Sequence, residues 1–184
     1  MAIETPPPEL GATCPDFRLP AVDGRAYARD DFASAPVLVV MFICNHCPYV
    51  KAVVDKLVRD AGELRDHGIG SVAICSNDAA DYPEDSFDNM KALAARMRFP
   101  FSYLWDETQA VAKHYGAVCT PDFFGFNAAL ALQYRGRLDD AGRALKPDAP
   151  RELYEAMLQV ARTGRGPAQQ TPSIGCSIKW RSAA

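Results

Sequence analysis

An uninterrupted apolar run that leads straight into two cysteines is the feature that most constrains the fold of this chain. Residues 37–43 are β-branched, aromatic or otherwise apolar, a pattern typical of a strand buried on both faces of a parallel sheet. The motif Cys44-Asn45-His46-Cys47 follows at once. From Pro48 onward apolar residues recur at helical spacing until His67-Gly68, which is a typical helix stop. This segment therefore predicts a strand, a C-x-x-C motif and a helix in direct succession.

The remaining pattern predicts a layered α/β domain. Short strands around Asp23-Gly24 indicate a hairpin, and the later segments alternate between strand and helix. We expect strands at 69–76, 101–105, 122–127 and 129–135, and helices at 86–98, 107–115 and 150–162. The order βαβαβαββα fits a thioredoxin-like fold better than a doubly wound nucleotide-binding fold, which needs more crossovers.

Length and charge narrow the class of protein. The 184 residues suit a single domain over 1–184, with residues 1–16 as an N-terminal arm and 163–184 as a C-terminal tail rich in Gly, Pro and Gln. The net charge is −3 and no block of Lys or Arg occurs, so we expect neither a nucleic acid nor a membrane partner. The N-terminus lacks the features of a secretory signal and the longest apolar run, 35–44, is short for a membrane span, so a cytoplasmic location is expected.

The C-x-x-C motif carries the predicted chemistry. A thiol at a helix N-terminus faces unpaired backbone N–H groups, which stabilise the thiolate and lower its pKa. We therefore expect Cys44 to be the exposed nucleophile and Cys47 to be the partner that attacks the mixed disulfide. His46 either adds a cation that favours the thiolate or is an ordinary loop residue.

Two further cysteines leave alternatives open. Cys119 and Cys176 could complete a zinc site with the C-x-x-C pair, but the sequence contains no second C-x-x-C, and we expect no metal and no cofactor. Cys119 precedes Thr120-Pro121, where a cis peptide bond is tolerated at the start of a strand. It is either a third thiol near the site or a small buried apolar residue. Cys176 lies either on a mobile tail or on a packed terminal strand.

Four segments resemble the peroxiredoxin-like (AhpC/TSA-type, or redoxin) branch of the thioredoxin superfamily: residues 11–24, 44–51, 116–122 and 173–180. The resemblance covers most of the chain. It implies a central mixed sheet flanked by helices, with an N-terminal hairpin extension and a C-terminal tail. It also implies a cis Pro121 facing the C-x-x-C motif, and it aligns Cys47 with the peroxide-reacting cysteine of peroxiredoxins.

The functional prediction follows from where the chain departs from that family. Peroxiredoxins place a Pro and a Thr where this chain has Val40 and Cys44, which makes a thioredoxin-like dithiol. We expect a thiol-disulfide oxidoreductase in redox homeostasis, with protein disulfides or a thioredoxin-type reductant as partners. One alternative is a thiol peroxidase acting on small peroxides, in which Cys47 attacks and Cys44 or Cys176 resolves the sulfenic acid. A second alternative is a non-catalytic redox sensor or metal-binding module built from Cys44, Cys47, Cys119 and Cys176.

Overall fold

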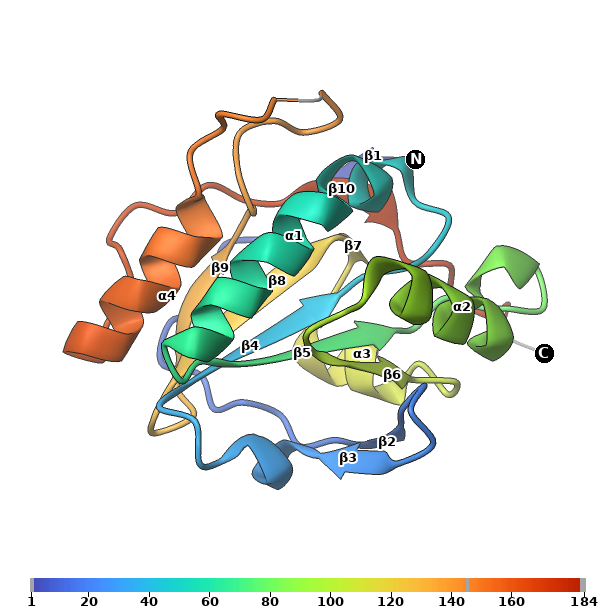
Figure 1. The fold of residues 1–184 in the computed structure, drawn as a ribbon, viewed down its shortest axis with the longest axis horizontal. Coiled ribbons are helices and arrows are strands. Elements are labelled where there is room, and N and C mark those ends of the chain that lie inside the picture. Colours follow the sequence, from blue (N-terminus) through green and yellow to red (C-terminus); the bar gives the residue numbers. More distant parts are fainter. Residues whose placement is uncertain (1, 145, 183–184) are drawn as a thin grey trace.

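The structure, a computed structural model, describes residues 2–144 and 146–182. Its centre is a five-stranded mixed sheet in the order β6-β5-β4-β8-β9 (Figure 1). Strand β4 pairs in parallel with β5 and antiparallel with β8, so the strand that leads into the C-x-x-C motif lies in the middle of the sheet. The five strands of this sheet are β4 (Val37–Phe42), β5 (Gly70–Cys75), β6 (Ser102–Trp105), β8 (Asp122–Asn127) and β9 (Leu132–Gly136).

Helices lie on both faces of this sheet. They are α1 (Pro48–Asp66), α2 (Phe87–Met97), α3 (Ala110–Tyr115) and α4 (Glu152–Thr163). Figure 1 shows α1 and α4 side by side across the near face of the sheet, while α3 and a hairpin of β2 (Arg18–Pro20) and β3 (Ala26–Ala28) lie on the other side. Two 3-10 helices, Arg29–Phe32 and Pro83–Asp85, complete the connections in this part of the chain.

The sheet separates two apolar cores because successive strand residues point to opposite faces. In β4, Val37, Val39 and Met41 pack with α1 and α4, while the alternate residues pack with α3 and the N-terminal hairpin. All six residues of β4 are buried. This burial on both sides accounts for the unbroken apolar run in the sequence.

A second, three-stranded sheet lies above the amino end of α1. It consists of β1 (Ala2–Glu4), β10 (Ile174–Ser177) and β7 (Cys119–Thr120), with β10 in the middle and both pairings antiparallel. This small sheet holds the N-terminal and C-terminal segments together beside the C-x-x-C loop (Figure 1). Of the two alternatives for Cys176, the structure shows the packed strand.

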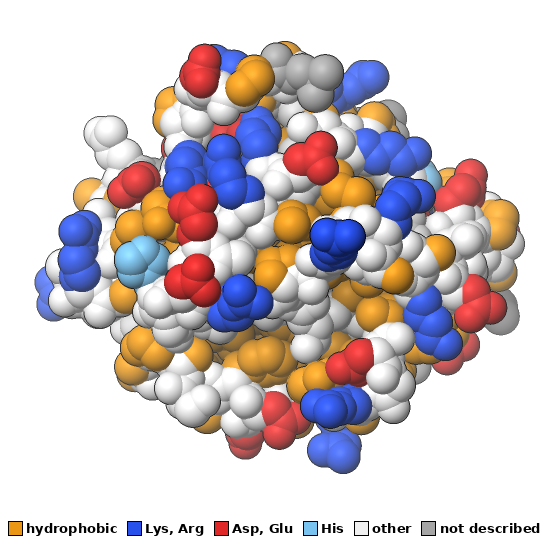
Figure 2. All heavy atoms as spheres, viewed as in Figure 1, with side chains coloured by type: hydrophobic (Ala, Val, Ile, Leu, Met, Phe, Trp, Pro, Cys, Tyr) orange, Lys and Arg blue, Asp and Glu red, His pale blue; other side chains and the backbone are white. Residues whose placement is uncertain are grey.

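The thioredoxin-like α/β fold expected from the sequence is confirmed. The hairpin turns at Gly24, whose φ of +87° suits a residue without a Cβ. Helix α3 is shorter than expected because Gln109, before its first turn, has a left-handed backbone with φ of 64°. Within the described residues, no helix is both long and apolar enough to cross a membrane. Figure 2 shows acidic and basic side chains interspersed over the face that carries α1.

Candidate active site

The C-x-x-C motif lies between the carboxyl end of β4 and the start of α1. Pro48 takes the first helical position, where a missing N–H costs nothing, and Cys47 is therefore the N-cap residue. Cys44 lies in the loop before the helix. The expectation that Cys44 occupies the helix N-terminus is wrong, because Pro48 sets the start of the helix three residues later.

Both sulfur atoms are enclosed. Cys44 and Cys47 are each 0% exposed, so the expectation of an exposed Cys44 is also wrong. Cys44 Sγ lies 3.3 Å from Thr120 Oγ1, and Cys47 Sγ lies 3.1 Å from the carbonyl oxygen of Thr120. The strand that contains Thr120 therefore covers the pair.

The two thiols differ in acidity. Cys44 donates a hydrogen bond to Cys47, and this bond, its burial and the nearby Asp85 carboxylate all raise the pKa of Cys44 well above its ordinary value. The same hydrogen bond lowers the pKa of Cys47 to about 4, helped by the backbone N–H of Val50 and opposed by burial. The Thr120 carbonyl accepts a hydrogen bond from the thiol form of Cys47 and so also opposes ionisation, but the groups that donate hydrogen bonds to the Cys47 thiolate outweigh it. Cys47 is therefore the thiolate, and Cys44 the thiol.

This assignment predicts a thiolate in the reduced protein at mildly acidic pH. One thiolate absorbance in the ultraviolet should persist from pH 8 down to about pH 5 and disappear near the pKa of Cys47. Because this pKa lies below the ordinary value of 9.0, the thiolate stabilises the reduced fold at neutral pH, and this contribution is lost as pH falls through about 4. The measurement is a spectroscopic pH titration of reduced protein.

The matched variants for this titration are Cys47→Ser and Cys75→Ser. Burial raises the pKa of Cys75 to about 12, so its removal should leave the titration unchanged. Removal of Cys47 should eliminate the low-pH thiolate. A titration that survives Cys47→Ser and is lost in Cys44→Ser would reverse the assignment.

A buried carboxylate that the sequence did not reveal organises the C-x-x-C loop. Asp85, at the end of the Pro83–Asp85 turn, is 0% exposed and accepts the backbone N–H groups of Asn45 at 2.7 Å and His46 at 3.2 Å. It also accepts Asn77 Nδ2 at 2.7 Å. Asp85 follows the motif by about forty residues and resembles any acidic residue before a helix, so no local pattern marks it.

His46 contacts this carboxylate rather than the Cys47 sulfur. Its Nδ1 lies 2.6 Å from Asp85 Oδ2 and 4.0 Å from Cys44 Sγ, and its ring stacks on Tyr82 with centroids 5.2 Å apart. A carboxylate only accepts, so Nδ1 carries the proton that is shared with Asp85. His46 thus lies on the Cys44 side of the pair.

Cys44, His46 and Asp85 also form a group with metal-ligand chemistry, since their ligand atoms lie within 4.8 Å of one another. The 2.6 Å separation of Nδ1 and Oδ2 is that of a hydrogen bond. Asp85 already accepts three other N–H groups, so its lone pairs are satisfied without an ion. The hydrogen-bonded arrangement therefore accounts for this group.

The Thr120-Pro121 peptide bond is cis and lies against the C-x-x-C pair. Cys119, one residue earlier, is buried and directs its thiol to the Pro121 carbonyl at 3.7 Å. Burial and the neighbouring Asp122 raise its pKa. Cys176 instead is paired with Thr120 across β10 and β7, and its side chain is a hydrogen-bond partner of Cys47.

A buried ion pair fixes the strand that follows Pro121. Arg135 Nη2 lies 2.9 Å from Asp122 Oδ2 and donates to the Gly116 carbonyl at 2.7 Å. The guanidinium also lies over the ring of Phe124, 4.5 Å from its centroid. Asp122 is 0% exposed, and burial raises its pKa to about 6 despite the arginine.

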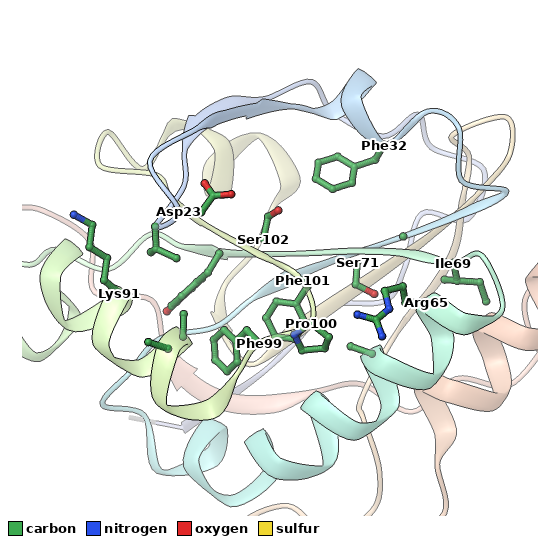
Figure 3. Close-up of a pocket in the computed structure, with 16 residues that line it drawn as sticks. Asp23, Phe32, Arg65, Ile69, Ser71, Lys91, Phe99, Pro100, Phe101 and Ser102 are labelled. Carbon is green, nitrogen blue, oxygen red and sulfur yellow. The ribbon is translucent and has the colours of Figure 1, made fainter.

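A cavity lies beside Cys44 of the redox pair. It measures about 270 Å³ and lies between α1 and α2, where Cys44 forms part of its wall. Its other lining residues are Asn45, Val50, Lys51, Val54, Asp55, Leu93, Arg96 and Met97. A much larger cavity of about 620 Å³ lies at the other end of α1, where Arg65, Ser71 and Phe101 line it (Figure 3). It is lined from the amino ends of β5 and β6, whereas the thiols lie near the carboxyl end of β4.

The model of the AhpC/TSA family matches residues 10–139, which include both cysteines of the motif and the cis-Pro segment. The chain belongs to the AhpC/TSA family. This AhpC/TSA protein is 47% identical to an uncharacterized conserved protein from Geobacillus kaustophilus, with a TM-score of 0.94 over 100% of this chain and 98% of the other. It is 36% identical to a hypothetical protein from Sinorhizobium meliloti 1021, with a TM-score of 0.92 over 98% and 99%.

More distant structures share the fold alone. The peroxidoxin BcpB from Mycobacterium tuberculosis is 17% identical, with a TM-score of 0.63 over 85% of this AhpC/TSA chain and 98% of the other. No significant match is found among curated proteins. The family therefore shows a thiol-based redox protein of the redoxin type.

Proposed function

We propose that this protein is a thiol-disulfide oxidoreductase that uses the Cys44–Cys47 pair. The observation that carries the proposal is the position of both sulfurs at the start of α1 against the cis-Pro segment, with Cys44 Sγ 3.3 Å from Thr120 Oγ1 and Cys47 Sγ 3.1 Å from the Thr120 carbonyl oxygen. The roles differ from the sequence-based expectation, because Cys47 supplies the attacking thiolate and Cys44 supplies the second thiol. The six free thiols suit a reducing compartment such as the cytoplasm.

The exchange proceeds in two balanced steps. The Cys47 thiolate attacks one sulfur of a substrate disulfide, so that a mixed disulfide forms and the other substrate sulfur leaves as a thiolate. Cys44 then passes its proton to that thiolate and attacks Cys47 Sγ. The Cys44–Cys47 disulfide forms, and the substrate leaves with both sulfurs reduced.

The neighbourhood of the pair supports attack by Cys47. Donors around Cys47 stabilise the thiolate, which is the form that attacks a substrate disulfide. The cavity beside Cys44 carries Lys51 and Arg96 around the apolar Val54 and Met97. We propose that it receives the substrate segment next to the reacting disulfide, with protein disulfides or a thioredoxin-type reductant as partners.

The burial of both sulfurs favours a second candidate, a thiol peroxidase. Hydrogen peroxide is small enough to reach an enclosed thiolate, and Cys47 at 0% exposure would be oxidised to a sulfenic acid that Cys44 resolves to the disulfide with release of water. Peroxidases of the family have a single attacking cysteine with a Thr in the position of Cys44. This chain has the Cys44–Cys47 dithiol instead, which favours disulfide exchange as the leading candidate.

A paired assay separates the two candidates. We expect catalytic amounts of the protein to accelerate the reduction of insulin disulfides by dithiothreitol, and we expect Cys47→Ser to remove this acceleration because no thiolate then remains to attack the substrate disulfide. Oxidation by one equivalent of hydrogen peroxide should be no faster than that of a small thiol. Fast formation of a Cys47 sulfenic acid, with no acceleration of insulin reduction, would establish the peroxidase instead.

A further inference from the structure

The C-x-x-C pair has no exposed sulfur, yet a third and partly exposed thiol packs beside it. Cys44 and Cys47 are buried, whereas Cys176 on β10 is partly exposed. Cys176 packs against the core cluster that contains both buried cysteines, and it is paired across the strands with Thr120, which contacts both of them. Of the six cysteines, it is therefore the one that combines contact with Cys47 and access from outside.

The position of Cys176 beside the pair is set by the backbone pairing of β10 with β7. Cys176 is the antiparallel partner of Thr120, and the Thr120 carbonyl lies 3.1 Å from Cys47 Sγ. Gly175 lets the strands come this close, since a Cβ at that position would overlap the Thr120 carbonyl oxygen. Beyond β10, Lys179 N donates to Asn77 Oδ1 at 2.9 Å, and Asp78 N donates to the Lys179 carbonyl at 2.9 Å. The strand is thus held on both sides of Cys176.

We propose that Cys176 is a third redox-active thiol, which takes over the disulfide from Cys44 and is the sulfur that an external dithiol attacks. The inference rests on the dithiol function proposed above and adds the route by which electrons enter. The buried pair meets the substrate at the cavity between α1 and α2, and Cys176 meets the reductant on the side of the small sheet.

The transfer is an internal thiol-disulfide exchange. Cys176 loses its proton and attacks Cys47 Sγ in the Cys44–Cys47 disulfide, so the Cys47–Cys176 bond forms and Cys44 leaves and takes up a proton. One thiolate of the external dithiol then attacks Cys176 Sγ and expels Cys47. The second thiol of the reductant then attacks the reductant sulfur that is bound to Cys176. This step releases Cys176 as a thiol and leaves the reductant with an internal disulfide.

The acidities of the thiols favour the second step, in which the external thiolate attacks Cys176 and expels Cys47. Burial and the hydrogen bond to Cys47 raise the pKa of Cys176 to about 11, whereas that of Cys47 is lowered to about 4. The sulfur with the lower pKa is the better leaving group. An external thiolate that attacks the accessible Cys176 therefore expels the best leaving group of the three.

Mapping of disulfides in Cys44→Ser tests the proposal directly. Oxidation of this variant with glutathione disulfide should give a Cys47–Cys176 disulfide, identified by non-reducing peptide mapping. Glutathione bound to Cys47 beside a free Cys176 thiol would overturn the inference. Cys176→Ser, oxidised in parallel, should form Cys44–Cys47. If that bond also fails to form, the proposed function fails as well, whereas its formation confines the failure to the role of Cys176.

A backbone variant tests the placement without removing a thiol. In the Cys44→Ser background, Gly175→Ala should lower the rate of Cys47–Cys176 formation about tenfold or more, because the new Cβ forces β10 away from Thr120. Gly62→Ala is the matched control, since a Cβ there meets no atom within 4 Å. Equal rates for the Gly175→Ala protein and its parent would show that the pairing of β10 with β7 does not position Cys176.

Discussion

Replacing Cys47 with serine is expected to abolish disulfide exchange while the fold persists. Cys47 is the hydrogen-bond partner of both other thiols at the site, so its removal eliminates the Cys44–Cys47 and the Cys47–Cys176 bonds together. We expect the rate of insulin reduction above background to fall by at least about a thousandfold, the loss typical of a missing nucleophile. After mild oxidation, the remaining five cysteines of the variant should stay thiols in a thiol count under denaturing conditions.

Cys14→Ser provides the control for this prediction. Cys14 is buried on the other face of the sheet, where it contacts the hydroxyl of Tyr115 at 3.2 Å. Its replacement should leave exchange unchanged. A stable mixed disulfide between Cys44 and the substrate in Cys47→Ser would show that Cys44 is the attacking sulfur and would restore the assignment expected from the sequence.

The largest effect on stability is expected for Arg135→Met. This change leaves the Asp122 carboxylate buried without its partner, and breaking a buried pair in this way typically costs about 3–5 kcal/mol of unfolding free energy. The loss of unfolding free energy caused by Arg135→Met should be smaller at pH 5 than at pH 7. The reason is that the folded-state pKa of Asp122, already raised to about 6 by burial, rises further without the arginine, so the carboxyl is neutral in the folded variant. Urea denaturation at the two pH values measures both effects.

An exposed pair provides the comparison. Lys91 and Asp88 lie 3.9 Å apart on the surface of α2, where Lys91→Met should change the unfolding free energy by less than about 1 kcal/mol at either pH. A similar small change for Arg135→Met would mean that water reaches Asp122 in the folded protein. Such a result would also remove the argument that this ion pair fixes the strand after Pro121.

The sequence was informative wherever a feature depends on neighbouring residues. The apolar run of β4, the helical spacing of α1 and the turn at Gly24 are local patterns, and the structure confirms all three. The family resemblance is confirmed by the match over residues 10–139. The expected position of Cys44 failed although a local signal was present, since Pro48 favours the first helical position and so marks Cys47 as the cap.

Features that depend on distant residues could not be predicted in this way. Asp85 reaches the motif only because the connection after β5 folds back over it. Cys176 lies beside Cys47 because β10 pairs with β1 on one side and with β7 on the other, and both partner strands are distant from it in the sequence. Short strands of three and four residues have no periodicity long enough to recognise.

The small sheet also has a consequence for the order in which the site is assembled. Its β1 and β10 strands join residues 2–4 to residues 174–176, the two ends of the chain, and such non-local contacts carry the largest loop-closure entropy. The helix cap at Cys47, in contrast, forms from neighbouring residues of the chain and requires no distant segment. A nascent or clipped chain that lacks residues after 173 therefore contains the reactive pair and the Thr120 segment that covers it, but lacks β10. The third thiol joins the pair only when β10 pairs with β7.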